Sequence, residues 1–327
     1  MGALEALIAA GHELAAVVTQ PDKPKGRGHA MQTTPVKDAA LAHGLPVWQP
    51  NKVRDPEFLE ELKKVQPDAI VVVAFGQIIP KAILELPRYG CINVHASLLP
   101  KYRGAAPIQW AVIDGEEVSG VTIMKMDQGL DTGDMLSVVE VPLAEDETGG
   151  SLFDKLSQAG ADQLVRTLAD LEAGKIQPKK QPEESPTPYA RMIQKADGLI
   201  DWTKDGVVLE RLIRGLNPWP SAYTHLKGKT LKIWKAALTG TDQEEACGSR
   251  RACASEEPCA QQGADARQDS CAHQPGEILS AGKEGLLVQT GKGVLKILEL
   301  QLEGKKRMEA EAFLRGCALE VGSLLGE

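Results

Sequence analysis

Several features that mark other classes of protein are missing from this sequence. No run of about twenty consecutive apolar residues occurs, so no segment is an obvious transmembrane helix. The first residues are not a charged stretch followed by an apolar one, as a secretory leader would be. The net charge of −8 argues against a protein that coats nucleic acid through bulk positive charge, although it leaves room for local basic patches. We therefore expect a soluble, cytoplasmic protein that does not bind membranes.

Two more absences concern cofactors and cysteine chemistry. The motif Gly-x-Gly-x-x-Gly does not occur, so the sequence gives no support for a nucleotide cofactor. The chain has six cysteines, which we expect to be free thiols because no leader directs the chain to an oxidising compartment. Their spacings near one histidine, with five, five and eleven residues between the cysteines, are not those of paired zinc ligands: Cys247, Cys253, Cys259, Cys271 and His273. We predict no metal site.

Alternating apolar and amphipathic segments predict an α/β domain in the first half of the chain, with a doubly wound, mostly parallel sheet. The predicted strand at 68–75 is continuously apolar after Asp68, which is typical of a parallel strand covered on both faces. Helices are expected at 35–43, 56–65 and 150–174. The chain begins with a helix at 3–11, although a helix that feeds a parallel sheet normally follows a strand. We therefore expect that the first strand of this domain is missing.

The second half of the chain has a different pattern. Four prolines among charged residues predict a stiff, exposed linker at 177–188, between domains at 1–176 and 189–327. Beyond it, a helix at 207–214 precedes short strand-like runs at 222–226, 230–236, 286–290 and 294–301. Short strands with glycine turns predict a small OB-like β-barrel. A polar, alanine-rich insertion at about 240–275 interrupts this pattern, and we expect it to be disordered.

The part of the second domain from 189 to 240 is locally basic, with nine lysine and arginine residues against four aspartate and glutamate residues. Aromatic residues are interleaved with these charges: Trp202, Trp219, Tyr223 and Trp234. Such a surface can face RNA, with bases stacking on the rings. Taken one by one, the aromatic residues are better explained as barrel core, with the lysines exposed to solvent. The basic excess is the better argument for RNA.

The segment 91–112 combines residues suited to acyl chemistry. Asn93 and His95 lie two positions apart in an apolar run that we expect to be a buried strand, so both side chains point to one face. A neutral amide and an imidazole at the carboxyl end of a strand can stabilise an oxyanion and move a proton. The loop 129–134 adds Asp131, whose carboxylate can orient the imidazole or take a proton from an attacking amine. Taken alone, Asp131 is equally a turn former between glycines.

The motifs resemble those of a known family. Asn-Val-His-Ala-Ser-Leu-Leu-Pro at 93–100 is followed by Tyr-Arg-Gly-Ala-Ala-Pro-Ile-Gln, then by Gly-Val-Thr-Ile-Met, Gly-Leu-Asp-Thr-Gly-Asp and Arg-Gly-Leu-Asn-Pro-Trp-Pro. Together they resemble the formyltransferases that use 10-formyltetrahydrofolate, and within these the ones that act on methionyl-tRNA. The resemblance covers most of the chain except its start and residues 240–275. It implies a Rossmann-like catalytic domain followed by an OB-like domain that binds tRNA.

The resemblance also implies roles for individual residues. Catalysis would fall to Asn93, His95 and Asp131. Folate would lie against the backbone around Phe75 and Gly76, and would be bound mainly by backbone groups of the loop Ser97, Leu98, Leu99 and Pro100. The glycine-, proline- and lysine-rich segment 21–34, by itself readable as a solvated loop, would be an arm that reaches the acceptor stem of initiator tRNA. Its contacts to phosphates would be Lys23, Lys25 and especially Arg27.

The activity that the resemblance implies is transfer of the formyl group of 10-formyltetrahydrofolate to the amino group of methionyl-initiator tRNA for translation initiation, by a monomeric enzyme. Two alternatives stay open. The acceptor can be a small-molecule amine such as an amino-sugar nucleotide, and the segment from Lys23 to Arg27 discriminates between that acceptor and tRNA. Alternatively, the chain binds tRNA without efficient catalysis, because the first strand of its catalytic domain is expected to be missing.

Overall fold

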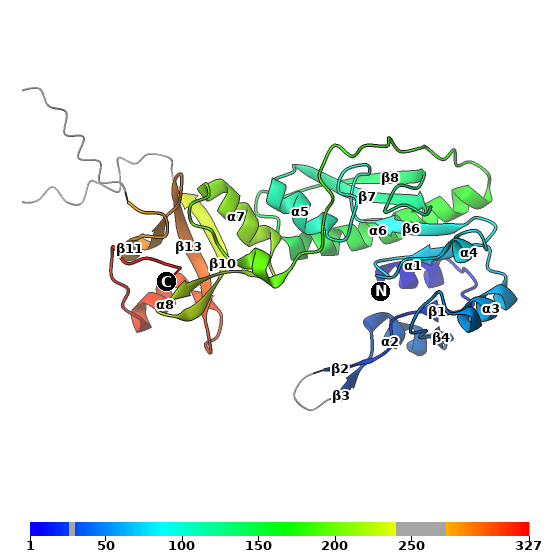
Figure 1. The fold of residues 1–327 in the computed structure, drawn as a ribbon, viewed down its shortest axis with the longest axis horizontal. Helices are drawn as coiled ribbons and strands as arrows, with labels where there is room; N and C mark the ends of the chain where they lie inside the picture. The colour runs from blue at the N-terminus through cyan, green and yellow to red at the C-terminus, as the bar shows by residue number, and fades with distance from the viewer. Residues whose placement is uncertain (26–29, 240–272, 327) are drawn as a thin grey trace, which may run out of the picture. The chain divides into compact units, whose positions relative to one another are not determined.

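The computed structural model describes residues 1–25, 30–239 and 273–326, and within them the chain forms two compact units (Figure 1). The first unit contains Met1–Ala111 and Glu116–Met192, and the second contains Val112–Gly115 and Ile193–Glu327. Arg27, the four cysteines from Cys247 to Cys271 and most of the insertion at 240–275, for which predictions were made, lie outside the described residues.

Strands and helices alternate in the first unit, as predicted. Its elements are α1 (Gly2–Ala9), β1 (Val17–Val18), β2 (Lys23–Lys25), β3 (Ala30–Gln32), α2 (Pro35–Ala42), β4 (Val47–Trp48), α3 (Pro56–Val65), β5 (Ile70–Val72), α4 (Lys81–Leu84), β6 (Cys91–His95), α5 (Pro107–Asp114), β7 (Val118–Lys125), β8 (Met135–Pro142) and α6 (Gly149–Glu172). Strand β1 pairs with β4 in parallel, and a separate sheet has the order β5-β6-β7-β8. The α/β class is confirmed. Only β5 and β6 are parallel in the larger sheet, since β7 and β8 form an antiparallel hairpin.

Helix α6 covers the larger sheet and packs against β7 and β8. Its inward-facing leucines, Leu152, Leu156 and Leu164, are at most 2% exposed because they recur at helical spacing on one face. The helix begins at a capping box, in which the Thr148 hydroxyl accepts from the Ser151 amide. Such a start satisfies amide groups that the first helical turn leaves without partners.

The segment 21–34, which we predicted to be a loop, contains a short hairpin instead. Strands β2 and β3 pair antiparallel, with Lys23 opposite Gln32 and Lys25 opposite Ala30. The prediction of a simple loop was wrong because the glycine and proline content of the segment hid two short strands. In Figure 1 this hairpin projects from the first unit below α2.

The segment that we predicted to be a linker is bonded to the first unit. Lys179 exchanges two backbone hydrogen bonds of 2.9 Å with Met135, and the Ala190 amide donates to the Arg103 carbonyl at 2.8 Å. Most of its side chains are exposed, but Gln181 is only 6% exposed. The boundaries that we assigned to the two domains stay predictions.

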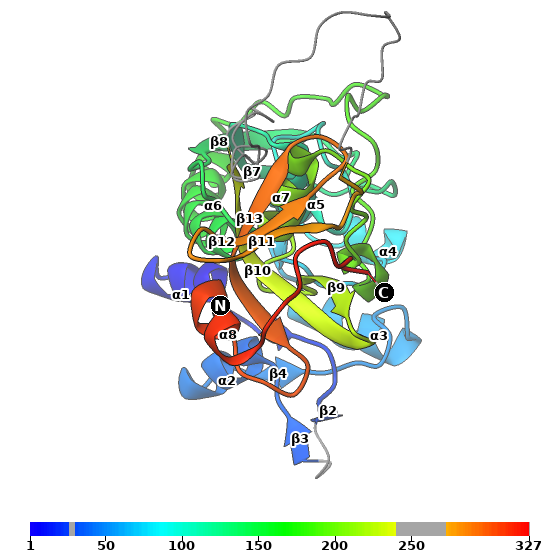
Figure 2. The same cartoon turned by 90° about the vertical axis from the view of Figure 1, so that its left-hand side faces the viewer.

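The second unit is built on antiparallel strands, consistent with a small barrel-like domain (Figure 2). Its elements are the 3-10 helix η1 (Lys195–Gly198), α7 (Gly206–Gly215), β9 (Ala222–Leu226), β10 (Lys229–Thr239), β11 (Ile278–Gly282), β12 (Gly285–Gln289), β13 (Val294–Leu302), β14 (Met308–Glu309) and α8 (Ala310–Gly316). The strand order is β11-β12-β13-β10-β9, and β14 pairs with β13. Sequence analysis did not predict β11, β14 or α8.

The aromatic residues of this unit divide between core and surface. Trp202 is 5% exposed and donates from its ring nitrogen to the Thr224 hydroxyl, so it belongs to the core. Trp219 is 54% exposed. The Trp234 ring lies under two cations, with the Arg307 guanidinium 4.8 Å and the Lys232 ammonium 5.6 Å from the ring centroid. Neither of the two explanations offered for these residues therefore holds for all of them.

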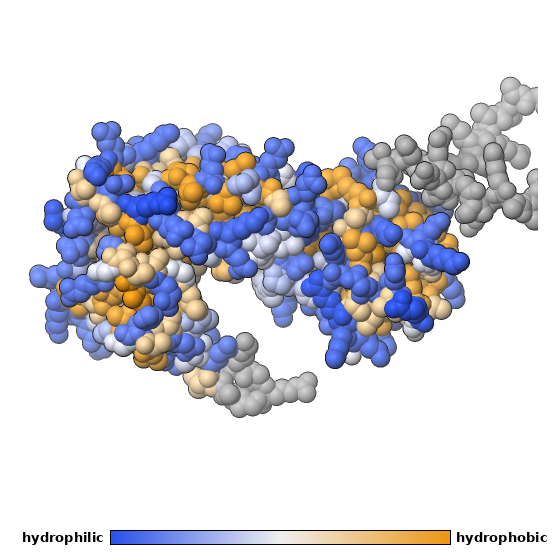
Figure 3. All heavy atoms as spheres, turned by 180° about the vertical axis from the view of Figure 1, so that it is seen from behind, coloured by the Kyte–Doolittle hydropathy of each residue, from blue (hydrophilic) through white to orange (hydrophobic). Residues whose placement is uncertain are grey.

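Among the described residues, no helix combines the length and apolar character needed to cross a bilayer. The same residues contain no cluster of three or more histidine, cysteine, aspartate or glutamate side chains placed to hold a metal ion. On the face seen in Figure 3, hydrophilic side chains cover most of each unit and hydrophobic ones show in patches between them.

Glu147, just before α6, generates a prediction about stability. Its side chain is 1% exposed, yet it accepts from the Ala144 amide at 3.0 Å, from the Ser151 hydroxyl and from the Lys155 ammonium. Burial acts to raise the pKa of this carboxyl, but these hydrogen bonds outweigh burial and hold the pKa below its usual value. Its stabilising effect is therefore complete above the ordinary glutamate pKa of about 4.3, and is lost as the pH falls through the lower folded-state pKa.

We expect Glu147→Gln to lower the free energy of unfolding at neutral pH by about 1–3 kcal/mol, because it removes charge-assisted hydrogen bonds in a buried site. The measurement is urea unfolding at neutral pH and near pH 4. The difference between the variant and the wild type should shrink on acidification. Glu145→Gln, at an exposed position two residues earlier, is the control and should have little effect. A Glu147→Gln deficit that stays constant with pH would contradict this account.

Candidate active site

Strand β6 presents the two polar residues that sequence analysis singled out. It lies between β5 and β7, with Asn93 opposite both Val72 and Met124, and His95 opposite Thr122. Asn93 is 9% and His95 6% exposed, although both are polar. Because side chains alternate along a strand, Asn93 and His95 share one face of the sheet. The sheet therefore holds an amide and an imidazole at its most buried strand.

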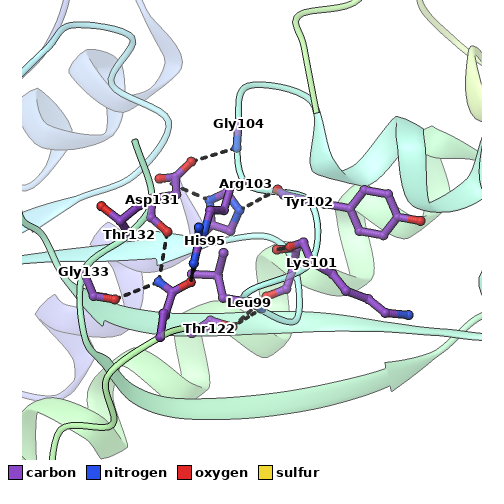
Figure 4. Close-up of polar contacts among 12 residues, drawn as sticks. His95, Leu99, Lys101, Tyr102, Arg103, Gly104, Thr122, Asp131, Thr132 and Gly133 are labelled. Atoms are coloured by element: carbon purple, nitrogen blue, oxygen red, sulfur yellow. Dashed lines mark hydrogen bonds and ion pairs between the residues drawn. The ribbon is translucent and has the colours of Figure 1, made fainter. Parts of the chain in front are cut away.

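The His95 ring is held from both sides (Figure 4). Its Nε2 lies 3.0 Å from the carbonyl oxygen of Tyr102, and its Nδ1 lies 3.7 Å from Oδ1 of Asp131. A carbonyl oxygen only accepts hydrogen bonds, so Nε2 must carry the proton. In the neutral ring Nδ1 then carries the lone pair. The pair formed by Nδ1 and the carboxylate can consequently receive one proton, which is the property that a general base requires.

Asp131 comes to this position from the turn between β7 and β8. Its Oδ2 accepts from the Gly104 amide at 2.9 Å, which leaves Oδ1 toward the imidazole. Its backbone adopts φ +57°, a left-handed conformation that aspartate tolerates better than most residues. Gly133 is required in the same turn, since a Cβ there would lie 1.9 Å from the Lys125 carbonyl oxygen. The turn thus fixes the direction of one carboxylate.

The Asn93 carboxamide makes no hydrogen bond with any other residue in the described part of the chain, whereas the His95 ring and Asp131 are both engaged. Its amide is therefore available as a neutral donor on the face that carries His95. The structure brings His95 and Asp131 together, as the resemblance implies, and keeps Asn93 on the same strand face. The catalytic roles of the three stay predictions.

The loop after β6 uses several of its backbone groups internally. The Thr122 hydroxyl donates to the Ser97 carbonyl at 2.7 Å and accepts from the Leu99 amide at 3.1 Å. The Ser97 hydroxyl donates to the Lys101 carbonyl at 2.7 Å. The Pro100 carbonyl accepts from Ser185 at 2.8 Å. The predicted binding of folate through this loop consequently depends on its shape and on those backbone groups that have no partner within it.

Phe75 and Gly76 follow β5, the parallel neighbour of β6. Gly76 has φ +75°, which suits glycine, and the side-chain amide of Gln20 donates to the Phe75 carbonyl at 3.3 Å. The two residues therefore sit after the strand beside Asn93. Sequence analysis gave Gln20 no role, and its bond to Phe75 was not predicted.

The base of the β2–β3 hairpin is fixed by a polar network. The Lys37 ammonium donates to Asp22 at 2.6 Å and to the Gln49 side chain at 2.7 Å, and the Gln49 amide donates to Asp22 at 2.8 Å. The hydrogen bond from Lys37, followed by that from Gln49, lowers the pKa of Asp22. Lys23 is exposed, and its ammonium donates to the Gln20 side chain at 3.2 Å. Lys25 lies in β2.

No hydrogen bond or ion pair in the described residues joins Lys23 to Asn93, His95 or Asp131. The hairpin and the histidine site are thus two separate parts of the first unit. Sequence analysis missed the residues that orient the site: Thr122, Arg103, Gly104 and Gln181. Of these, Thr122 could have been identified from the sequence, because it is a polar residue in the middle of an apolar strand.

Two family models match the chain. One, described as formyl transferase, matches residues 3–168, and the other, described as the C-terminal domain of formyl transferase, matches residues 192–318. The chain belongs to the formyl transferase family. The expected family is therefore confirmed across both units of this formyl transferase.

Curated relatives extend the assignment along almost the whole formyl transferase. The methionyl-tRNA formyltransferase of Agathobacter rectalis is 56% identical over 324 residues, which cover 99% of this chain and 95% of that protein. That of Geobacter sulfurreducens is 49% identical over 324 residues, 99% of this chain and 92% of that protein. Among solved structures, the N-formyltransferase of Helicobacter canadensis with folinic acid and dTDP-3-aminofucose has a TM-score of 0.58. It covers 90% of this chain and 94% of its own at 17% identity, which shows a common fold.

We expect Thr122→Val to lower the free energy of unfolding of this formyl transferase by about 1–3 kcal/mol, because the Ser97 carbonyl and the Leu99 amide would lose their partner in a buried site. Valine has the shape of threonine, so packing is preserved. Urea unfolding measures the loss, and hydrogen exchange should show faster exchange of the Leu99 amide.

The matched control is Thr230→Val on β10, because the Thr230 hydroxyl makes no hydrogen bond with other described residues. It should leave stability nearly unchanged. Equal effects of the two substitutions would show that the Thr122 hydroxyl does not hold the loop.

Proposed function

We propose that this formyl transferase moves the formyl group of 10-formyltetrahydrofolate to the amino group of methionyl-initiator tRNA. The observation that carries the proposal is the 56% identity to a methionyl-tRNA formyltransferase over 99% of the chain. The pairing of His95 with Asp131 at 3.7 Å supports the same chemistry. We expect the enzyme to act in the cytoplasm, as a monomer.

The reaction begins with attack of the methionyl amine on the formyl carbon. A C–N bond forms and the carbonyl electron pair moves to the formyl oxygen, which becomes an oxyanion. The Asn93 amide, which has no partner among the described residues, donates to this oxygen. A neutral donor held on a buried strand needs little reorganisation as the charge develops, which is why such donors accelerate acyl transfer.

Two proton movements complete the transfer. The attacking nitrogen becomes positively charged and loses a proton to the pair formed by His95 Nδ1 and Asp131 Oδ1. The oxyanion then re-forms the formyl carbonyl, the C–N bond to N10 of the folate breaks, and the proton held by the His95–Asp131 pair passes to N10, so that neutral tetrahydrofolate leaves. The Tyr102 carbonyl contributes by holding Nε2, at 3.0 Å, so that Nδ1 is the nitrogen that faces the carboxylate.

Substrate selection is assigned to different parts of the chain. The folate is expected to lie against Phe75, Gly76 and the loop Ser97–Pro100, next to β6. The tRNA is expected to contact the β2–β3 hairpin, through Lys23, Lys25 and Arg27. The network around Asp22 anchors the base of that hairpin to Lys37 and Gln49, which supports its use as an arm. An amino-sugar acceptor would not need this basic arm.

A purified-protein assay with 10-formyltetrahydrofolate and charged initiator tRNA tests the function. Formylated methionyl-tRNA is expected. His95→Ala should lower kcat by roughly 10²- to 10³-fold, as loss of a preorganised catalytic group does, while folate binding by calorimetry persists. His43→Ala, an exposed histidine at the end of α2, is the control and should keep wild-type turnover.

The assay also separates the alternatives. Turnover of an amino-sugar nucleotide without tRNA formylation would replace the proposed acceptor. Retained tRNA binding without formylation of either acceptor would indicate a binding protein. Wild-type turnover by His95→Ala would remove His95 from the mechanism.

Arg27→Ala should weaken tRNA use and spare folate. Loss of one phosphate contact reduces the slope of log affinity against log salt by roughly one. The readouts are the KM for tRNA at several salt concentrations and the Kd for folate. Lys64→Ala, which removes an exposed positive charge from α3, is the control. An unchanged salt slope in Arg27→Ala would count against the arm.

A further inference from the structure

Gln181 is a buried polar residue in a segment whose side chains are mostly exposed. It is 6% exposed and lies beyond α6, in the segment that runs back along the first unit. Nothing in the proposed transfer uses it. Its carboxamide nevertheless contacts the backbone of the turn that carries Asp131 and the side chain of Arg103, which lies between Tyr102 and Gly104.

The carboxamide makes four hydrogen bonds. Its nitrogen donates to the Asp131 carbonyl at 2.9 Å and to the Gly133 carbonyl at 2.7 Å. Its oxygen accepts from Arg103 Nε at 3.1 Å and from Arg103 Nη2 at 3.0 Å. A guanidinium only donates and a carbonyl only accepts, so the orientation of the amide is fixed and its capacity is fully used.

Arg103 connects the Gln181 carboxamide to the segment 102–104, which holds the His95 ring. It stands between Tyr102, whose carbonyl holds His95 Nε2, and Gly104, whose amide holds Asp131 Oδ2 (Figure 4). Arg103 is 8% exposed, and its guanidinium also donates to the Pro182 carbonyl at 2.7 Å and the Glu183 carbonyl at 3.0 Å. Gln181 thus ties the segment 102–104 to the turn at 131–133.

The turn that carries Asp131 needs the hydrogen bonds from Gln181 because its backbone conformation is unfavourable. Asp131 holds a left-handed backbone conformation, φ +57°, which carries a cost for a residue with a Cβ. The bonds from Gln181 to the carbonyls of Asp131 and Gly133 stabilise that conformation, and with it the direction of the carboxylate. An error of about 1 Å in the placement of a catalytic group can lower a rate by about 10²-fold.

We propose that Gln181 is a positioning residue for formyl transfer, which keeps the Asp131 carboxylate directed at His95. This inference rests on the proposed function. Gln181 touches no reacting atom and acts through Asp131. The segment 177–188 of the first unit, which was predicted to be a linker, is accordingly part of the support of the active site.

The test uses Gln181→Met in the full chain, a change that keeps the length of the side chain and removes its hydrogen bonds. We expect kcat to fall roughly 10- to 100-fold with little change in KM for either substrate, because geometry and not binding is altered. Lys180→Met, the same replacement at the exposed neighbouring position, is the control and should keep wild-type kcat. Wild-type kcat in Gln181→Met would overturn the proposal.

A double-mutant cycle with Asp131→Asn separates positioning from a general structural role. If Gln181 acts through Asp131, Gln181→Met should lower kcat much less in the Asp131→Asn background than in the wild type. The same fold-loss in both backgrounds would refute the assignment.

Hydrogen exchange gives a readout that does not need activity. The amides of the turn at 129–134 should exchange faster in Gln181→Met than in Lys180→Met, and equal rates would refute the assignment. This result stands even where the wild type fails to formylate tRNA, so failure of the proposed function and failure of this inference are distinguishable. If Gln181→Met does not fold, Gln181→Glu replaces it, because it keeps the bonds from Arg103 and loses those to the turn.

Discussion

The hydrogen bond from the Gly104 amide to Asp131 Oδ2 is the contact on which the rest of the active site depends. It occupies one carboxylate oxygen, so the other is left at 3.7 Å from the His95 ring. Side-chain carboxylates rotate readily, and only a donor of fixed direction can select one orientation. Here that donor is a backbone amide, which cannot move without the loop from Tyr102 to Arg103. The loop itself holds the opposite nitrogen of the same ring through the Tyr102 carbonyl.

The surrounding structure can be understood as support for this pair. The sheet provides a rigid strand, β6, for Asn93 and His95, while α6 buries the strands beside it. Thr122 fixes the loop after β6 from the neighbouring strand, and Gln181 fixes the turn that carries Asp131. Buried polar groups in this region are therefore satisfied by other polar groups of the protein, as a low-dielectric interior requires. The Asn93 amide makes no hydrogen bond with the other described residues, which leaves it available for the contact to the oxyanion that we propose.

Chemistry and acceptor choice rest on different observations. The fold is shared with an N-formyltransferase that was solved with an amino-sugar nucleotide, at 17% identity, and a shared fold does not choose between acceptors. The closely similar methionyl-tRNA formyltransferases support tRNA, as does a basic hairpin whose base is fixed by Asp22, Lys37 and Gln49. The histidine site is thus the part expected to define the reaction, and the hairpin is the part expected to define the substrate.

Local patterns in the sequence determined many of the elements. Helix α3 and strand β9 have the predicted bounds, because proline starts, helical spacing and strand alternation act within a few residues. The spacing of Asn93 and His95 on one strand determined that they share a face. The motifs determined the family. Tertiary structure decided which distant groups meet, since Arg103 and Gln181 lie 78 positions apart and no local period relates them. It also decided that Trp202 lies in the core and that Trp234 stacks with two cations. The segment 177–188, which was predicted to be a linker, contacts the turn that carries Asp131. Such contacts depend on how the chain returns on itself, and this is set by the whole fold and not by neighbours in sequence.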